Sequence, residues 1–481
     1  MQQLTGLDAA FLALETPSVY GHVGSVCVLD PTTATEPLTL ERLTQLVSDR
    51  LHLVPPFRRR LASVPLGLDQ PYWIEDPDFD IEFHVRELAL PAPGDDRQLS
   101  EQAARLHARQ LDRNRPLWEL YLIHGLDGGR IAIYTKVHHS AIDGVSGNDI
   151  LTALLDLSPE GRDLGTPPEW KCDEQPSSVG MVVRSALSLA TQPLRAARVS
   201  YGLLRSAPTL AASVPRPALP VVDRLLGRDR NVVLAGGGVS LRAPATPFNR
   251  SIGPHRRWGF RSVPLDQVKD VKNAAGVTVN DVVMAMSAGA MRSWLRDHDA
   301  LPDRPLVAAV PVSVRTDEQK GTGGNRVSSM IAPLPTNIDD PAERLRAAHE
   351  AMRAAKDQHG ALPADLLADV TQFAMPALAG QAARLSARLK VVERVSPFNL
   401  IVSNVPGPNV PLYYGGAKLL AYYPLSAITD GQGLNITVMS YGGQLHFGVL
   451  GDRDLVPDVE RIAGYLADEL ELLHKVVVTT R

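Results

Sequence analysis

Two segments that mix strand-like and helix-like periodicity flank a segment that has neither, and this arrangement restricts the fold more than any other feature. In the first segment, the alternating stretch GHVGSVCVLD at 21–30 predicts a strand, and the stretches at 38–51 and 97–111 have helical spacing. The last segment repeats this mixture, with a strand predicted at 256–265, a long helix at 277–295 and a hairpin around Gly442 and Gly443. These patterns predict an α/β (α+β) protein built from two parts with mixed sheets.

The middle segment sets the predicted domain boundaries. Residues 1–165 form the predicted N-terminal domain, 166–255 a helical segment and linker, and 256–481 the predicted C-terminal domain. Within the linker, residues 179–205 are small and apolar and carry arginines but no acidic residue. This composition fits an interfacial helix that meets a lipid surface, and it also fits a helix packed across the two halves, because Pro193 breaks its continuity. Both interpretations stay open.

Composition and charge exclude several classes of protein. With 44% hydrophobic residues among 481, the chain can build sizeable cores, and a net charge of only -4 argues against a nucleic-acid partner. The two cysteines, Cys27 and Cys172, form no CxxC pair, which fits a reducing, cytoplasmic compartment. No secretory signal is expected, because the N-terminus lacks a basic region and Asp8 interrupts its apolar part. No apolar run is long enough to predict a transmembrane helix.

The clearest chemical motif is KVHHSAIDGVSG at 136–147, where a predicted strand runs into a predicted helix. A metal site is not supported: His139 and Asp143 have helical spacing, but a catalytic metal needs three protein ligands and the sequence has no HExxH motif. In a structural interpretation, His138 packs under the strand and Asp143 caps the helix. General-base chemistry is the better interpretation for His139, because an imidazole at a strand end titrates near neutrality and can accept a hydroxyl proton.

The stretch VTVNDVV at 277–283 predicts the start of the long helix. Thr278 is a good N-cap, and Asp281, three residues later, completes a variant capping box. That structural role is sufficient to explain Asp281. Asn280 is different, because a side-chain amide beside free helix N–H groups can stabilise the oxyanion of a tetrahedral intermediate. Asn280 is therefore a candidate oxyanion donor.

The motif HHxxxDG, formed here by His138, His139, Asp143 and Gly144, resembles the signature of coenzyme A-dependent acyltransferases of the chloramphenicol acetyltransferase and condensation-domain type. Other stretches, taken in order, resemble the bacterial wax ester synthase/diacylglycerol acyltransferase family over nearly the whole chain. These stretches are LTGLDAAFL (4–12) with ET (15–16), GHVG (21–24), PPFRRRL (55–61), RPLWEL (115–120), VNDVV (279–283), PVSVR (311–315), GNRVSSM (324–330) and SNVPGP (403–408).

The resemblance implies two chloramphenicol acetyltransferase-like halves that enclose a tunnel, with the histidine motif at their interface. It implies that His139 is the general base, which deprotonates the acceptor hydroxyl so that its oxygen attacks the acyl-CoA thioester. No acyl-enzyme is expected, since the chain has no GxSxG nucleophile elbow. No cofactor is implied beyond acyl-CoA as a co-substrate. The catalytic candidates are His138, His139, Asp143 and Asn280.

The resemblance also suggests supporting residues. Asp143 is expected to pair with Arg315 and hold the histidine loop, since a buried unpaired carboxylate would be costly. Gly144 is expected to allow close backbone approach to substrate, although simple turn chemistry explains it equally well. The other substrate-binding candidates are Ser403 and Asn404, after a predicted strand on the tunnel wall, and Asp281.

Two further features have competing interpretations. Trp118 in RPLWEL is expected to be a packing anchor rather than a binding residue. Arg58, Arg59 and Arg60 can meet the phosphates of coenzyme A, but a run of three arginines is more often a solvated or helix-end patch.

The predicted function is acyl-CoA-dependent O-acyl transfer that forms triacylglycerol from diacylglycerol, with wax esters from long-chain alcohols as a second product. The expected partners are acyl-CoA and diacylglycerol or a long-chain alcohol, with a peripheral position at the inner membrane or a lipid droplet. Two alternatives stay open: a condensation-type acyltransferase that takes its acyl group from a carrier protein, and a non-catalytic protein at a lipid surface. The intact HHxxxDG and VNDVV argue against the second alternative.

Overall fold

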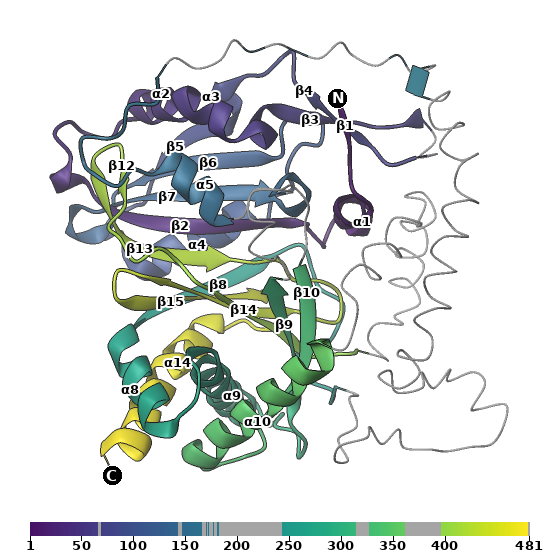
Figure 1. Cartoon of the computed structure of the whole chain (residues 1–481), viewed down its shortest axis with the longest axis vertical. Coiled ribbons are helices and arrows are strands. Elements are labelled where there is room, and N and C mark those ends of the chain that lie inside the picture. Colours follow the sequence, from purple (N-terminus) through teal and green to yellow (C-terminus); the bar gives the residue numbers. More distant parts are fainter. Residues whose placement is uncertain are drawn as a thin grey trace.

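Two six-stranded mixed sheets dominate the protein, one above the other in Figure 1. The computed structural model describes residues 1–65, 69–142, 147–165, 243–313, 327–360 and 396–479, together with 170, 172, 177, 180 and 181. Several predictions lie outside the described residues: those for Asp143, Gly144, Arg315 and, apart from residues 180 and 181, the segment 179–205.

The N-terminal sheet has the strand order β12-β13-β2-β7-β6-β5. Its N-terminal strands are β2 (His22–Asp30), β5 (Val85–Ala89), β6 (Trp118–His124) and β7 (Ile131–His138). The surrounding helices are α1 (Gly6–Leu14), α2 (Leu40–Arg50), α3 (Ile81–His84), α4 (Asp96–His107) and α5 (Gly147–Leu154). A small sheet of β1 (Gln2–Gln3), β4 (Tyr72–Glu75) and β3 (Arg59–Ala62) lies beside α1 in Figure 1. The strands and helices predicted for this half are confirmed within a few residues at their ends.

Two strands from the C-terminal half of the chain complete the N-terminal sheet. β12 (Tyr413–Tyr414) and β13 (Ala417–Leu425) form an antiparallel pair, and β13 pairs antiparallel with β2. Figure 1 shows these yellow-green strands beside the purple β2. The predicted boundaries therefore do not separate the two sheets, because a strand pattern indicates extended backbone but not which edge supplies its hydrogen-bond partners. The division into domains at 1–165, 166–255 and 256–481 stays a prediction.

The C-terminal sheet has the order β10-β9-β11-β14-β15-β8. Its strands are β8 (Arg256–Pro264), β9 (Leu306–Ser313), β10 (Val327–Leu334), β11 (Leu400–Val405), β14 (Leu434–Tyr441) and β15 (Gln444–Asp452). The predicted hairpin is confirmed, since Gly442 and Gly443 join β14 to β15 with φ angles of 56° and 77°, a backbone conformation that favours glycine. The helices α8 (Leu265–Ala275), α9 (Val279–Asp297), α10 (Pro341–Gly360) and α14 (Val459–His474) cover the face away from the N-terminal half (Figure 1).

A shared apolar core joins the two halves. It combines Tyr134 of β7 and buried residues of α4 with Trp258 of β8, which is 1% exposed. The indole N–H of Trp258 donates to the carbonyl oxygen of Pro424 in β13, and the Ser100 hydroxyl of α4 donates to the carbonyl oxygen of Trp258. Full burial of one large apolar side chain contributes about 1.5–3 kcal/mol, so this core fixes the two halves relative to each other.

Helix length and composition give a limited result on membrane insertion. In the described part of the chain, no single helix is long and apolar enough to cross a membrane. α8 and α9 reach that length and composition only as a pair that is bent by 103°.

Candidate active site

The two adjacent histidines lie where β7 ends. β7 stops at His138, and a single 3-10 turn (His139–Ile142) follows it. The backbone N–H of His138 donates to the carbonyl oxygen of Leu117 at 2.9 Å, and that of His139 donates to the carbonyl oxygen of Gly21 at 2.8 Å. These bonds hold the two histidines against the residues that precede β6 and β2, so both imidazoles start from a fixed backbone.

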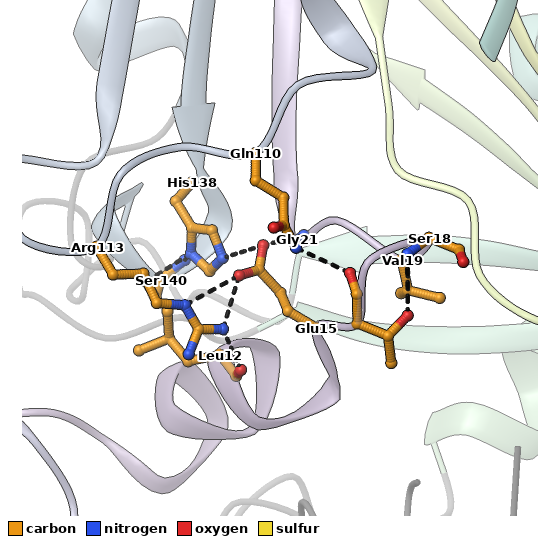
Figure 2. Close-up of polar contacts among 10 residues, drawn as sticks. Leu12, Glu15, Ser18, Val19, Gly21, Gln110, Arg113, His138 and Ser140 are labelled. Carbon is orange, nitrogen blue, oxygen red and sulfur yellow. Dashed lines mark hydrogen bonds and ion pairs between the residues drawn. The ribbon is translucent and has the colours of Figure 1, made fainter. Parts of the chain in front are cut away.

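The imidazole of His138 is 1% exposed and engaged at both nitrogens. Its Nδ1 accepts from the Ser140 hydroxyl at 2.7 Å and from the Ser140 backbone N–H at 3.1 Å. A neutral imidazole with Nδ1 as acceptor carries its proton on Nε2, which lies 3.2 Å from Oε1 of Glu15 (Figure 2). His138 therefore faces the interior and holds the turn together rather than offering a nitrogen to a substrate.

Glu15, just after α1, is the carboxylate that fixes this arrangement. Its Oε1 also accepts from the Gly21 backbone N–H at 2.8 Å, and its Oε2 accepts from Nη2 of Arg113 at 2.7 Å (Figure 2). Burial alone would raise the pKa of Glu15, but the hydrogen bond from His138, electrostatic attraction to that imidazole and the hydrogen bonds from Gly21 and Arg113 lower this pKa to about 2. Glu15 is therefore ionised at neutral pH. Glu15 lies in the stretch ET at 15–16, which belongs to the family resemblance, but the sequence predicted no role for this residue.

Gly21 leaves the space that His138 occupies. A Cβ added to Gly21 would lie 2.5 Å from Nε2 of His138, closer than side-chain atoms approach each other. This contact explains the glycine that opens GHVG in physical terms. Any larger residue would displace the imidazole from Glu15.

His139 is half-buried, and its ring stacks on Phe11 of α1 with the ring centroids 4.3 Å apart. The expectation that His139 titrates near neutrality is wrong, because burial lowers the pKa of His139 to about 4 and the neighbouring His138 acts in the same direction. The imidazole is therefore neutral at physiological pH, which is the form that a general base needs. Of the two histidines, His139 has the position and protonation state suited to accept a proton.

The first turn of α9 contains the predicted capping box. The Thr278 hydroxyl oxygen accepts from the Asp281 backbone N–H at 3.2 Å, and Asp281 Oδ2 accepts from the Thr278 backbone N–H at 2.9 Å. Asp281 is 2% exposed, and its Oδ2 also lies 2.8 Å from Nδ1 of His349 in α10. These partners favour the structural role of Asp281, and direct contact with a substrate stays a prediction.

Asn280 and Asn404 meet where α9 begins and β11 ends. The Asn404 side-chain amide donates to Oδ1 of Asn280 at 3.5 Å, at the long limit of a hydrogen bond. Both side chains are half-buried. Ser403 alternates to the other face of β11, the face of Val405, which packs against the N-terminal core. Ser403 and Asn404 thus point to opposite faces of the sheet at the end of β11.

Two sequence features have structural partners. The indole N–H of Trp118 donates to the Phe57 carbonyl oxygen at 2.8 Å and its ring is 1% exposed, so Trp118 is a packing anchor. Arg58 and Arg59 lie 3.7 and 2.9 Å from Glu75, and Arg60 lies 3.1 Å from Asp76. These ion pairs weaken the interpretation of the three arginines as a phosphate site.

The described residues also bear on metal binding. Within the described ranges, no group of three or more His, Cys, Asp or Glu side chains could hold a metal ion. His138 has Ser140 and Glu15 as its partners, so its nitrogens serve the turn.

Comparison with solved structures defines the fold. The first condensation domain of the calcium-dependent antibiotic synthetase matches with a TM-score of 0.54 and 17% identity, over 99% of this chain and 97% of that chain. At this identity the match shows the fold alone. The fold is the two-part arrangement shared by chloramphenicol acetyltransferase-like acyltransferases.

Closer matches give the family. The model of the wax ester synthase/diacylglycerol acyltransferase catalytic domain matches residues 4–283, and that of the family's C-terminal domain matches 323–474. A putative diacylglycerol O-acyltransferase of Mycobacterium tuberculosis is 39% identical over 98% of this chain and 100% of its own length. The wax ester synthase/diacylglycerol acyltransferase from Marinobacter aquaeolei VT8 is 31% identical, with a TM-score of 0.67 over 99% of this chain and 100% of that one. The chain belongs to the wax ester synthase/diacylglycerol acyltransferase family and is an acyltransferase.

Proposed function

We propose that the protein transfers a long acyl group from acyl-CoA to the free hydroxyl of diacylglycerol, and in a second activity to long-chain alcohols. The observation that carries the mechanism is the half-buried imidazole of His139 directly after β7, stacked on Phe11. Family membership supports the acyl donor and the lipid acceptor. No covalent acyl-enzyme takes part.

In the proposed reaction, the acceptor hydroxyl displaces coenzyme A from the thioester with the help of one general base. The unprotonated nitrogen of His139 takes the proton of the acceptor hydroxyl while the hydroxyl oxygen attacks the thioester carbonyl carbon. The tetrahedral intermediate collapses by breaking its carbon–sulfur bond, and the imidazolium returns its proton to the departing thiolate of coenzyme A. A positioned general base of this kind contributes typically about 10²–10⁴-fold to the rate.

The supporting groups act on geometry and charge. His138, Ser140 and Glu15 hold the turn so that the His139 backbone stays fixed against Gly21. Asn280 is the proposed oxyanion donor, and Asn404 orients its amide, since the Asn404 amide donates to Oδ1 of Asn280 and leaves Nδ2 to donate elsewhere. Asp143 and Arg315 stay a proposed ion pair that holds the histidine loop.

The direct experiment uses purified protein with palmitoyl-CoA and either diolein or hexadecanol. Triacylglycerol or wax ester should form in the same amount as free coenzyme A, which shows transfer rather than thioester hydrolysis. Omission of the acceptor is the control. Inactivity with every acyl-CoA, together with activity on an acylated carrier protein, would replace this proposal by the condensation-type alternative.

A lipid acceptor also requires access to a lipid surface, and the proposed site of contact is the arginine-containing segment 179–205. Full-length protein should float with liposomes that contain anionic lipid and diolein. Undiminished flotation of a protein that lacks 179–205 would remove this segment from the proposal.

A further inference from the structure

An apolar cavity of about 70 Å³ lies beside the turn formed by His139–Ile142, and the mechanism above does not use it. One wall is the side of β2 and β7 opposite to His138, and the other wall is α5. The hairpin of β12 and β13 contributes Tyr414 and Tyr422 to a third side. Its lining includes Ser25, Cys27, Thr135, Leu154, Tyr414 and Tyr422.

The cavity begins at the residues next to the chemistry. Val137, which lines it, directly precedes His138, and Ile142, which also lines it, ends the turn that begins at His139. On β2, Val23 pairs with Val137, and Cys27 lies four residues further along the strand, about 13 Å away at the usual rise per residue. The cavity therefore leads from the turn into the interior of the N-terminal half.

The lining suits hydrocarbon and no charged group. None of the described residues that form it is acidic or basic. Burial raises the pKa of the Cys27 thiol to about 12, and burial raises the pKa values of the Tyr414 and Tyr422 hydroxyls above their usual range. All three are neutral at physiological pH. The phosphates of coenzyme A would lose their hydration here without a partner, whereas methylene groups would gain from leaving water.

We propose that this cavity receives part of the hydrocarbon chain of the acyl donor and so sets the chain lengths that the enzyme prefers. The inference rests on the proposed function and gives the acyl chain of the donor a binding site in this cavity. Its volume is about half of that of a 150 Å³ cavity that holds benzene, so it has room for a few methylene groups of one chain. The acyl donor carries one chain, whereas diacylglycerol carries two on one glycerol.

The test changes the volume of the cavity and follows chain preference. Ser25→Leu fills it from β2, and Leu154→Ala enlarges it from α5. The ratio of kcat/KM for palmitoyl-CoA to that for butyryl-CoA is measured at a fixed concentration of diolein. Each methylene group that loses its place should reduce this ratio about fourfold, the equivalent of about 0.8 kcal/mol. We expect at least a tenfold lower ratio in Ser25→Leu and a higher ratio in Leu154→Ala.

A matched control separates chain recognition from overpacking. Ala153→Leu adds hydrocarbon at a buried position of the same helix that does not line the cavity, and its ratio should equal that of the wild type. A second series varies the acceptor from octanol to hexadecanol at fixed palmitoyl-CoA. Unchanged donor ratios in both cavity variants would overturn the proposal, and so would a shift confined to the acceptor series, because the occupant would then be the acceptor chain.

Binding of a fatty acid tests the cavity without any acyl transfer. Palmitate, a fatty acid without the coenzyme A part, should raise the Tm of the wild type and of Ala153→Leu but not that of Ser25→Leu. If the wild type transfers no acyl group and this binding pattern still appears, the proposed function fails and the hydrocarbon cavity stands. Equal stabilisation of all three proteins would count against the cavity whatever the activity.

Discussion

Removal of the Glu15 carboxylate should destabilise the protein far more than removal of a comparable surface carboxylate. The hydrogen bonds of Glu15 lower its pKa from the usual 4.5 to about 2. At about 1.4 kcal/mol per pKa unit, the ionised form is favoured in the folded state by about 3 kcal/mol. We therefore expect Glu15→Ala to lower the free energy of unfolding by about 3 kcal/mol at neutral pH, since it also leaves the buried His138 Nε2–H without its carboxylate.

The pH dependence gives the sign of this effect. Because the folded-state pKa of Glu15 is lowered, its stabilisation is fully present above pH 4.5 and is lost as the pH falls toward about 2. The difference between the wild type and Glu15→Ala should therefore be constant from pH 8 to pH 6 and shrink below pH 4.5. Urea unfolding followed by circular dichroism at each pH measures this difference.

The matched control is Glu87→Ala. Glu87 also pairs with a histidine, His124, at 3.3 Å, but their side chains are 49% and 38% exposed. An exposed pair of this kind contributes about 0–1 kcal/mol, so the control should lose little stability. Equal losses in Glu15→Ala and Glu87→Ala would refute the reasoning, as would a Glu15→Ala difference that persists unchanged at acid pH.

Three further predictions concern the same machinery. Gly21→Ala should lower kcat at least about tenfold, because its Cβ would lie 2.5 Å from Nε2 of His138, and wild-type kcat would contradict the packing argument. His349→Ala should cost about 1 kcal/mol in urea unfolding, because it removes a hydrogen bond to the buried Asp281, and unchanged stability would show that the cap alone holds α9. kcat/KM should be flat from pH 8 to pH 6 and fall with a midpoint near 4, because burial lowers the pKa of His139 to about 4; a midpoint near 6.5 would place the base elsewhere.

The features that the sequence predicted well are local. Thr278 and Asp281 are three residues apart, and their reciprocal cap follows from helix geometry alone. The hairpin at Gly442 and Gly443 likewise depends on neighbouring residues. Such features can be predicted because their hydrogen bonds form within one turn of backbone.

The features that were missed join distant parts of the chain. Glu15 and His138 are 123 residues apart, and their contact depends on how α1 packs against the end of β7. The pairing of β13 with β2 joins residues near 420 to residues near 27, and no periodicity records that partner. The apolar cavity exists because side chains from β2, β7, α5 and the β12–β13 hairpin meet in space. Local patterns predict elements, whereas these contacts follow from packing.

The role of His139 as the general base is tested by the rate at which His139→Ala forms triacylglycerol from palmitoyl-CoA and diolein. His124→Ala, at a partly exposed histidine away from the turn, is the control for loss of an imidazole. We expect kcat to be lower by about 10²–10⁴-fold in His139→Ala, with circular dichroism like that of the wild type, and to be unchanged in His124→Ala. Wild-type kcat in a folded His139→Ala protein would show that His139 is not the general base.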